Sequence, residues 1–174
     1  GAQLRKNPHT QLMGALLCPD VDEIHLTCDL DLRYLPRSAL NRVALKVHRD
    51  LDREATRRLM RQSNVVLYAT ISECAPMVPL ESLALGVPCL TGDNHGLFDG
   101  FPTLAQHLLI SRTDDPWAIA EAIGDLKRNY LACCAEIPTF NEHYNCRAEQ
   151  SLNSFLGLGS RRSEEVRDVR RIAG

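Results

Sequence analysis

Short apolar runs alternate with polar, helix-like segments along most of this 174-residue chain. The clearest run is residues 65–70 (VVLYAT), whose nearly continuous apolar character is typical of a strand that a parallel sheet buries on both faces. Shorter runs of the same kind predict four further strands, at residues 24–28, 43–47, 87–91 and 108–111.

Helical patterns fill the segments between these strands. Residues 9–17 carry apolar side chains at helical spacing, and Asp52 is placed to cap a helix that runs to about residue 62. Ser38 is placed to cap a brief helix through Arg42, and Gly86 suits the end of a helix over 77–85. Two more helices are predicted. One begins at Asp115 and Pro116, and its inward face is formed by Ile119, Ile123, Leu126 and Tyr130. The last covers about 141–156.

This alternation of strands and helices predicts parallel strands joined by right-handed crossovers. The expected fold is therefore α/β: a Rossmann-like three-layer sandwich with a parallel sheet, formed by residues 1–157. Residues 158–174 are crowded with charges and poor in apolar side chains, so we expect them to form a charged C-terminal tail.

Composition narrows the possible functions. The net charge of −2 predicts no general affinity for nucleic acid or acidic membranes, and no apolar run approaches the roughly 20 residues of a membrane span. The seven cysteines form no C-x-x-C pair and the six histidines show no metal-ligand spacing. We therefore expect a reduced cytoplasmic protein with no metal and no cofactor. Because the chain starts at Gly1, we also expect it to be part of a longer protein.

Two carboxylates are the most informative candidates for chemistry. Glu73 falls in a loop directly after the strongest strand, and Glu81 falls inside the helix that follows. Loops that follow parallel strands share the carboxyl edge of the sheet, so the loop at 92–98 should open there as well. A helix N-terminus favours phosphate, and carboxylates accept hydrogen bonds from vicinal hydroxyls. Together these features suggest a ligand that carries both phosphates and vicinal hydroxyls, which is the chemistry of a nucleotide sugar.

A cation for the diphosphate is available just before the first helix, at Arg5 and Lys6. Simpler interpretations exist for each residue. A glutamate near a helix N-terminus can act only by stabilising the helix, and Arg5 and Lys6 can be plain surface charge. His48, Asp93 and His95 follow strands and either face a ligand or belong to ordinary loops.

The motif Glu73, seven residues, Glu81, running into Gly86-Val87-Pro88, resembles that of the group 1 glycosyltransferases. Lys6-Asn7 before a helix is similar to the Lys-Gly or Lys-Asn of the same family. The resemblance is to the C-terminal, donor-binding domain of a retaining enzyme, which is one half of a GT-B fold. It implies transfer of a hexose from a nucleotide-diphosphate sugar, in polysaccharide biosynthesis, to an acceptor held by an N-terminal domain.

The resemblance also implies roles for individual residues. Glu73 would be the catalytic residue, contacting the transferred sugar, and Lys6, with Arg5 beside it, would neutralise the diphosphate. Glu81 would hold the ribose hydroxyls. The remaining donor-binding positions are the backbone groups of Cys74, Ala75, Pro76 and Met77 for the sugar and phosphates, and Val47 and His48 for the nucleobase.

Two positions depart from the family pattern. Cys74-Ala75-Pro76 replaces a Gly-aromatic-Gly sequence, and Pro76 removes one backbone donor. The family's second cation, an arginine about five residues before its lysine, corresponds to Gly1. Two alternatives therefore stay open: a non-catalytic interaction module on the same fold, and a GT-B nucleotide-sugar epimerase. We expect this chain alone to bind donor weakly or not at all and to lack transfer activity.

Overall fold

The structure is a computed structural model that describes residues 4–73 and 75–157. The chain divides into two compact units, one ending at Ile137 and the other beginning at Pro138, and each is described by itself. The predicted charged tail at 158–174 lies outside the described residues.

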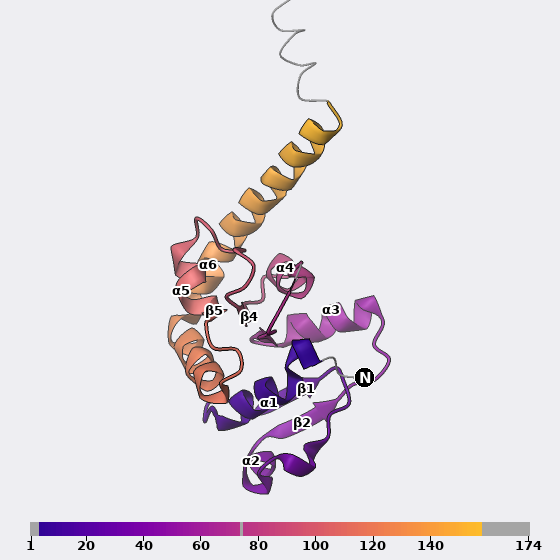
Figure 1. Ribbon diagram of the computed structural model, residues 1–174, viewed down its shortest axis with the longest axis vertical. Helices are drawn as coiled ribbons and strands as arrows, with labels where there is room; N and C mark the ends of the chain where they lie inside the picture. The colour runs from indigo at the N-terminus through magenta and orange to yellow at the C-terminus, as the bar shows by residue number, and fades with distance from the viewer. Residues whose placement is uncertain (1–3, 74, 158–174) are drawn as a thin grey trace, which may run out of the picture. The chain divides into compact units, whose positions relative to one another are not determined.

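The N-terminal part of the first unit is built on a two-stranded parallel sheet. Strand β1 (Glu23–Leu26) pairs with β2 (Ala44–Val47) from Glu23 opposite Ala44 to Leu26 opposite Val47. Helices α1 (Pro8–Leu17) and α2 (Arg37–Arg42) lie beside these strands in the indigo and purple part of Figure 1, and the short 3-10 helix η2 covers Leu32–Tyr34. A buried cluster fills this part of the unit: Leu12, Leu16, Leu35 and Val43.

A three-stranded parallel sheet forms the rest of this unit. It has the order β3 (Val66–Tyr68), β4 (Cys89–Gly92), β5 (Leu109–Ile110). All residues of β4 are buried, whereas β3 is only half-buried. The full burial on both faces that its apolar pattern predicted is therefore not found in β3, which lies at the edge of this sheet. The prediction of a parallel α/β fold is confirmed.

Local signals account for the helices around this sheet. The Asp52 carboxylate caps α3 (Arg53–Gln62) by accepting a 2.7 Å hydrogen bond from the Ala55 N–H, as predicted. Helix α4 (Met77–Ala84) ends at Gly86, which adopts a φ of 77° that glycine tolerates best. The Ser82 hydroxyl, buried inside α4, donates to Val87 O and fixes the turn into β4.

One helix was not predicted and one predicted cap is wrong. Helix α5 (Pro102–Leu108) was missed, although proline at its first turn and buried Leu104 and Leu108 at helical spacing signal it. Helix α2 begins at Arg37, with Pro36 at the cap position, so Ser38 lies within the helix and makes no cap. A proline fixes the backbone angle that the entry to a helix needs, and here it replaces a side-chain cap.

Helix α6 (Pro116–Phe155) is continuous where the sequence predicted two helices. The predicted break fell between residues 130 and 141, but the apolar stripe continues there through Cys133, Ile137 and Phe140, all of them buried. Pro138 lies inside this helix on an exposed position, and its missing N–H does not end the helix. None of the described helices combines the length and the apolar character needed to cross a membrane.

Candidate functional site

Three segments that are distant in the sequence meet at the carboxyl edge of β3 and β4. The N–H of Ile71, after β3, donates to the carbonyl of Arg5 in the 3-10 helix η1 (Leu4–Lys6) at 2.9 Å. The Asn94 side chain, in the loop after β4, donates to Thr70 O at 3.1 Å. The prediction that the loops following these two strands open onto one edge is therefore confirmed.

Asn7 fixes η1 and the start of α1 at this edge. Its backbone takes the left-handed conformation, with φ of 50°, which only glycine and asparagine adopt readily. This requirement explains why Lys-Gly or Lys-Asn suits this position. The Gln11 side chain adds two further bonds, since it accepts from Ala69 N–H at 3.1 Å and donates to Lys6 O at 2.5 Å.

Glu73 lies in the loop after β3, as predicted, and its carboxylate is nearly buried, with 10% of the side chain exposed. The Tyr68 hydroxyl donates to Oε2 at 2.7 Å, and Nη1 of Arg5 lies 3.8 Å from Oε1. Burial and the bond to the Glu73 carboxylate raise the pKa of Tyr68 to about 12, so the phenol keeps its proton. Lys6 is exposed beside Arg5 in η1.

Glu81 lies inside α4, again as predicted, but it has a different partner. Its Oε1 is 3.8 Å from Nη2 of Arg53, at the start of α3, and both side chains are substantially exposed. The two carboxylates of the motif therefore belong to separate charged pairs, Glu73 with Arg5 and Glu81 with Arg53. The Glu81–Arg53 pair is the exposed one and contributes little to stability, so Arg53 can turn toward a ligand at small cost.

The N-terminus of α4 offers fewer donors than a phosphate cradle needs. Pro76 and Pro79 have no N–H, and the Met77 N–H is bonded to Ala75 O at 2.8 Å. Three of the positions at this end of the helix, Pro76, Met77 and Pro79, therefore have no N–H to offer a ligand. Cys74 lies outside the described residues. The backbone contribution predicted for Pro76 and Met77 is thereby reduced, and a bound phosphate would depend more on cationic side chains.

Val47 and His48 lie at the carboxyl end of the other sheet, where His48 belongs to a hydrogen-bonded relay. Its Nε2 is 2.8 Å from Nδ1 of His25 on β1, and the planes of the two stacked rings are nearly parallel, with 10° between them. His25 Nε2 bonds in turn to the Glu23 carboxylate at 2.5 Å, and Lys46 lies 2.6 Å from the other oxygen of Glu23. The relay fixes the orientation of the His48 ring beside Val47.

His95, in the loop after β4, is a structural residue. Its Nδ1 accepts from Leu97 N–H at 3.2 Å, so Nε2 carries the proton and donates to the Thr91 hydroxyl at 3.0 Å. Burial lowers the pKa of His95, while the charges of Asp93 and Glu73 oppose this shift. The ring is therefore held neutral, with both nitrogens used inside its own loop.

Two residues of the site were missed by sequence reasoning, Tyr68 and His25. The signal for His25 is the parallel pairing of the two strands, which puts Leu26 opposite Val47 and so brings His25 close to His48. Tyr68 is the last residue of an apolar strand, and the pattern around it predicts a core position. Nothing in the pattern indicates that its hydroxyl turns toward the loop.

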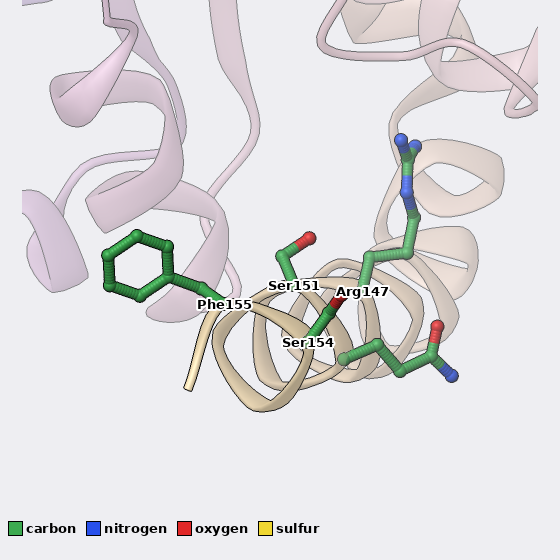
Figure 2. A pocket seen from close by; sticks show the side chains of 5 residues that line it. Arg147, Ser151, Ser154 and Phe155 are labelled. Carbon is green, nitrogen blue, oxygen red and sulfur yellow. The ribbon is translucent and has the colours of Figure 1, made fainter. Parts of the chain in front are cut away.

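A separate hollow lies on the far part of α6, lined by Arg147, Gln150, Ser151, Ser154 and Phe155. Figure 2 shows the Phe155, Ser151 and Arg147 side chains pointing in different directions around one helix. Polar groups do not converge there, and the hollow contains none of the predicted site residues. Within residues 4–73 and 75–157, no group of three histidine, cysteine or acidic side chains is placed to hold a metal ion.

Comparison with known families identifies the chain. The family model described as "Glycosyl transferases group 1" matches residues 31–136, which is more than half of the sequence. The chain belongs to this family. Both Glu73 and Glu81 fall inside the matched range, whereas Arg5 and Lys6 precede it. Family membership and fold together support glycosyl transfer.

Solved structures agree with the family. The chain is similar to the catalytic domain of cholesterol-alpha-glucosyltransferase from Helicobacter pylori, with a TM-score of 0.63 at 12% identity. The match covers 81% of this chain and 90% of that one. At this identity the likeness shows the fold, a Rossmann-like α/β domain of the kind that forms one half of a GT-B glycosyltransferase. No curated protein is detectably similar in sequence.

Proposed function

We propose that this group 1 glycosyltransferase chain binds a nucleotide-diphosphate sugar donor at the carboxyl edge of β3 and β4. The observation that carries the proposal is the pair formed by Arg5 and Glu73, which joins a cation and a nearly buried carboxylate 3.8 Å apart at that edge. A diphosphate needs the cation and sugar hydroxyls need the carboxylate. One small site therefore offers both groups that such a donor requires.

Most of the predicted site residues have a place in this proposal. Glu73 contacts hydroxyls of the transferred sugar and steadies the positive charge that develops at its anomeric carbon. Arg5 and Lys6 bind the diphosphate, and their role grows because the first turn of α4 has few donors. Glu81 leaves its weak ion pair with Arg53 and accepts hydrogen bonds from the ribose hydroxyls instead. Val47 and His48 flank the nucleobase, with Ala75 and Met77 lining the sugar.

The proposal extends to the longer protein. This chain is the C-terminal donor half, and an N-terminal domain holds the acceptor, so that transfer takes place between them. The similar catalytic domain is named as that of an alpha-glucosyltransferase, which supports a hexose as the transferred sugar and retention at its anomeric carbon. We place the reaction in polysaccharide biosynthesis in the cytoplasm, with no resident cofactor.

A second candidate is a non-catalytic interaction module that kept the fold and lost donor binding. The first turn of α4 favours it, because Pro76 and Pro79 have no N–H and the Met77 N–H is bonded to Ala75 O. This candidate predicts that the site residues matter for stability and not for any nucleotide.

Nuclear magnetic resonance titration of the chain with UDP, GDP and ADP tests the proposal, because it detects binding as weak as millimolar. One nucleotide should shift resonances of the edge residues, and Glu81→Ala should weaken that binding about tenfold, as loss of a charged hydrogen bond implies. The matched control is Glu54→Ala, since Glu54 is an exposed helical glutamate paired with Arg61 on α3. If no nucleotide binds at millimolar concentration, the interaction module is the better answer.

A further inference from the structure

Tyr68 is hydrogen-bonded through its hydroxyl to the Glu73 carboxylate. Tyr68 ends β3 and is paired in register with Thr91 of β4, so its backbone is fixed by the sheet. Glu73 follows in the loop after this strand. The 2.7 Å bond from the Tyr68 hydroxyl to Oε2 therefore links the loop carboxylate to a residue whose backbone belongs to the sheet.

Burial makes this bond important. A carboxylate that is 10% exposed has lost most of its water and needs donors from the protein to remain charged. Tyr68 supplies such a donor at every pH near neutrality, because burial and the carboxylate raise the pKa of its phenol to about 12. Arg5 is a weaker support, since it is half exposed and lies at 3.8 Å.

The two oxygens of Glu73 consequently have different surroundings. Oε2 is bonded to Tyr68, and Oε1 is the oxygen beside Arg5. We propose that Tyr68 is a positioning residue: it fixes the Glu73 carboxylate through Oε2, so that Oε1 is directed at the sugar of the donor. This inference rests on the proposed function, and it assigns a role to a residue outside the family motif.

Arg5 has a different part in the same arrangement. When a diphosphate draws Arg5 away from Oε1, the Glu73 carboxylate loses this cationic neighbour. The bond from Tyr68 persists through this exchange, because it uses the other oxygen. Tyr68 should therefore matter most for the sugar half of the donor and least for the nucleotide half.

A comparison of nucleotides with nucleotide sugars tests this role. The probes are UDP, GDP and ADP, each titrated against its glucose conjugate, on the wild-type chain and on Tyr68→Phe. We expect Tyr68→Phe to leave the affinity for the nucleoside diphosphate unchanged and to reduce the extra affinity contributed by glucose about tenfold. Tyr144→Phe, a partly exposed tyrosine of α6, is the control and should change neither value.

A double-mutant cycle with Glu73→Gln distinguishes positioning from packing. If Tyr68 acts through Glu73, the double variant should bind glucose conjugates no more weakly than Glu73→Gln alone. The same cycle on the denaturation midpoint should show coupling, because the bond between the two side chains also exists without ligand. The positioning role would be overturned if Tyr68→Phe weakened the binding of the nucleotide and of its glucose conjugate equally. Additive effects of the two substitutions in the cycle would overturn it as well.

The outcomes separate this inference from the proposed function. If a nucleotide binds but Tyr68→Phe does not change the extra affinity contributed by glucose, the inference is refuted. The proposed function is then unaffected. Failure of all three nucleotides and their conjugates to bind refutes the proposed function, and the inference with it. Absence of coupling in the denaturation cycle refutes the inference without reference to any ligand.

Discussion

Asn7 and Thr113 lie 106 positions apart in the sequence, and the Asn7 side-chain amide donates to the Thr113 carbonyl at 2.5 Å. This bond joins the start of α1 to the segment between β5 and α6. It places η1, with Arg5 and Lys6, against the strand ends, and so determines where the cations of the site lie. The left-handed backbone of Asn7 makes the same position sensitive to substitution.

Substitutions at Asn7 should separate the two roles of this residue. Asn7→Gly keeps the backbone conformation and loses only the bond to Thr113, so we expect it to destabilise the chain by about 1 kcal/mol. Asn7→Ala loses the bond and adds strain at φ of 50°, which should raise the loss to about 2 kcal/mol. Urea denaturation measures both values. A larger loss for the glycine variant would contradict this account of the left-handed conformation.

Gly14 should not accept a methyl group. A Cβ there would lie 2.6 Å from two side-chain atoms of Ile119 and 2.9 Å from Pro116 O, where α1 and the beginning of α6 are in contact. We expect Gly14→Ala to destabilise the chain by about 1–3 kcal/mol, as overpacking does. Gly124→Ala is the matched control, because its Cβ would meet only the Arg128 guanidinium, at 3.5 Å. It should be neutral or stabilising by up to about 1 kcal/mol in thermal unfolding.

Thr70 and Thr91 should respond in opposite ways to replacement by valine. Both are buried at neighbouring strand ends, but the Thr70 hydroxyl has no partner among the described residues, whereas the Thr91 hydroxyl accepts from His95. Thr70→Val removes an unsatisfied group and should stabilise the chain by on the order of 1 kcal/mol. Thr91→Val leaves the His95 N–H unpaired and should destabilise by a similar amount. A destabilising Thr70→Val would mean that its hydroxyl finds a partner in solution.

His95 should make stability depend on pH. Burial lowers its pKa below the ordinary 6.5, so the unfolded chain binds a proton more readily than the folded one. Its stabilising contribution is therefore complete above pH 6.5 and is lost as the pH falls through the lowered pKa. The free energy of unfolding should decline more steeply in the wild type than in His95→Gln between pH 7 and pH 5. Identical slopes for the two proteins would refute the assignment of a neutral, buried His95.

Much of the architecture could be predicted because its signals are local. The apolar run before Glu73, the Asp52 cap and the stop at Gly86 each depend on a few neighbouring residues, and each is found in the structure. The same signals put Glu73 in a loop and Glu81 in a helix. The break predicted before residue 141 failed because α6 follows a continuous apolar stripe across Pro138.

The sequence by itself determined the parallel α/β fold, the family and the edge of the sheet at which the loops after β3 and β4 meet. Tertiary structure decided which side chains meet there. Contacts such as Asn7 with Thr113 and His25 with His48 join segments that no periodicity relates, and they follow from how the strands and helices pack. Tyr68 and Glu73 are near in sequence, yet the turn of the loop decides that the hydroxyl and the carboxylate meet. Side-chain partners depend on three-dimensional packing, which a one-dimensional pattern does not contain.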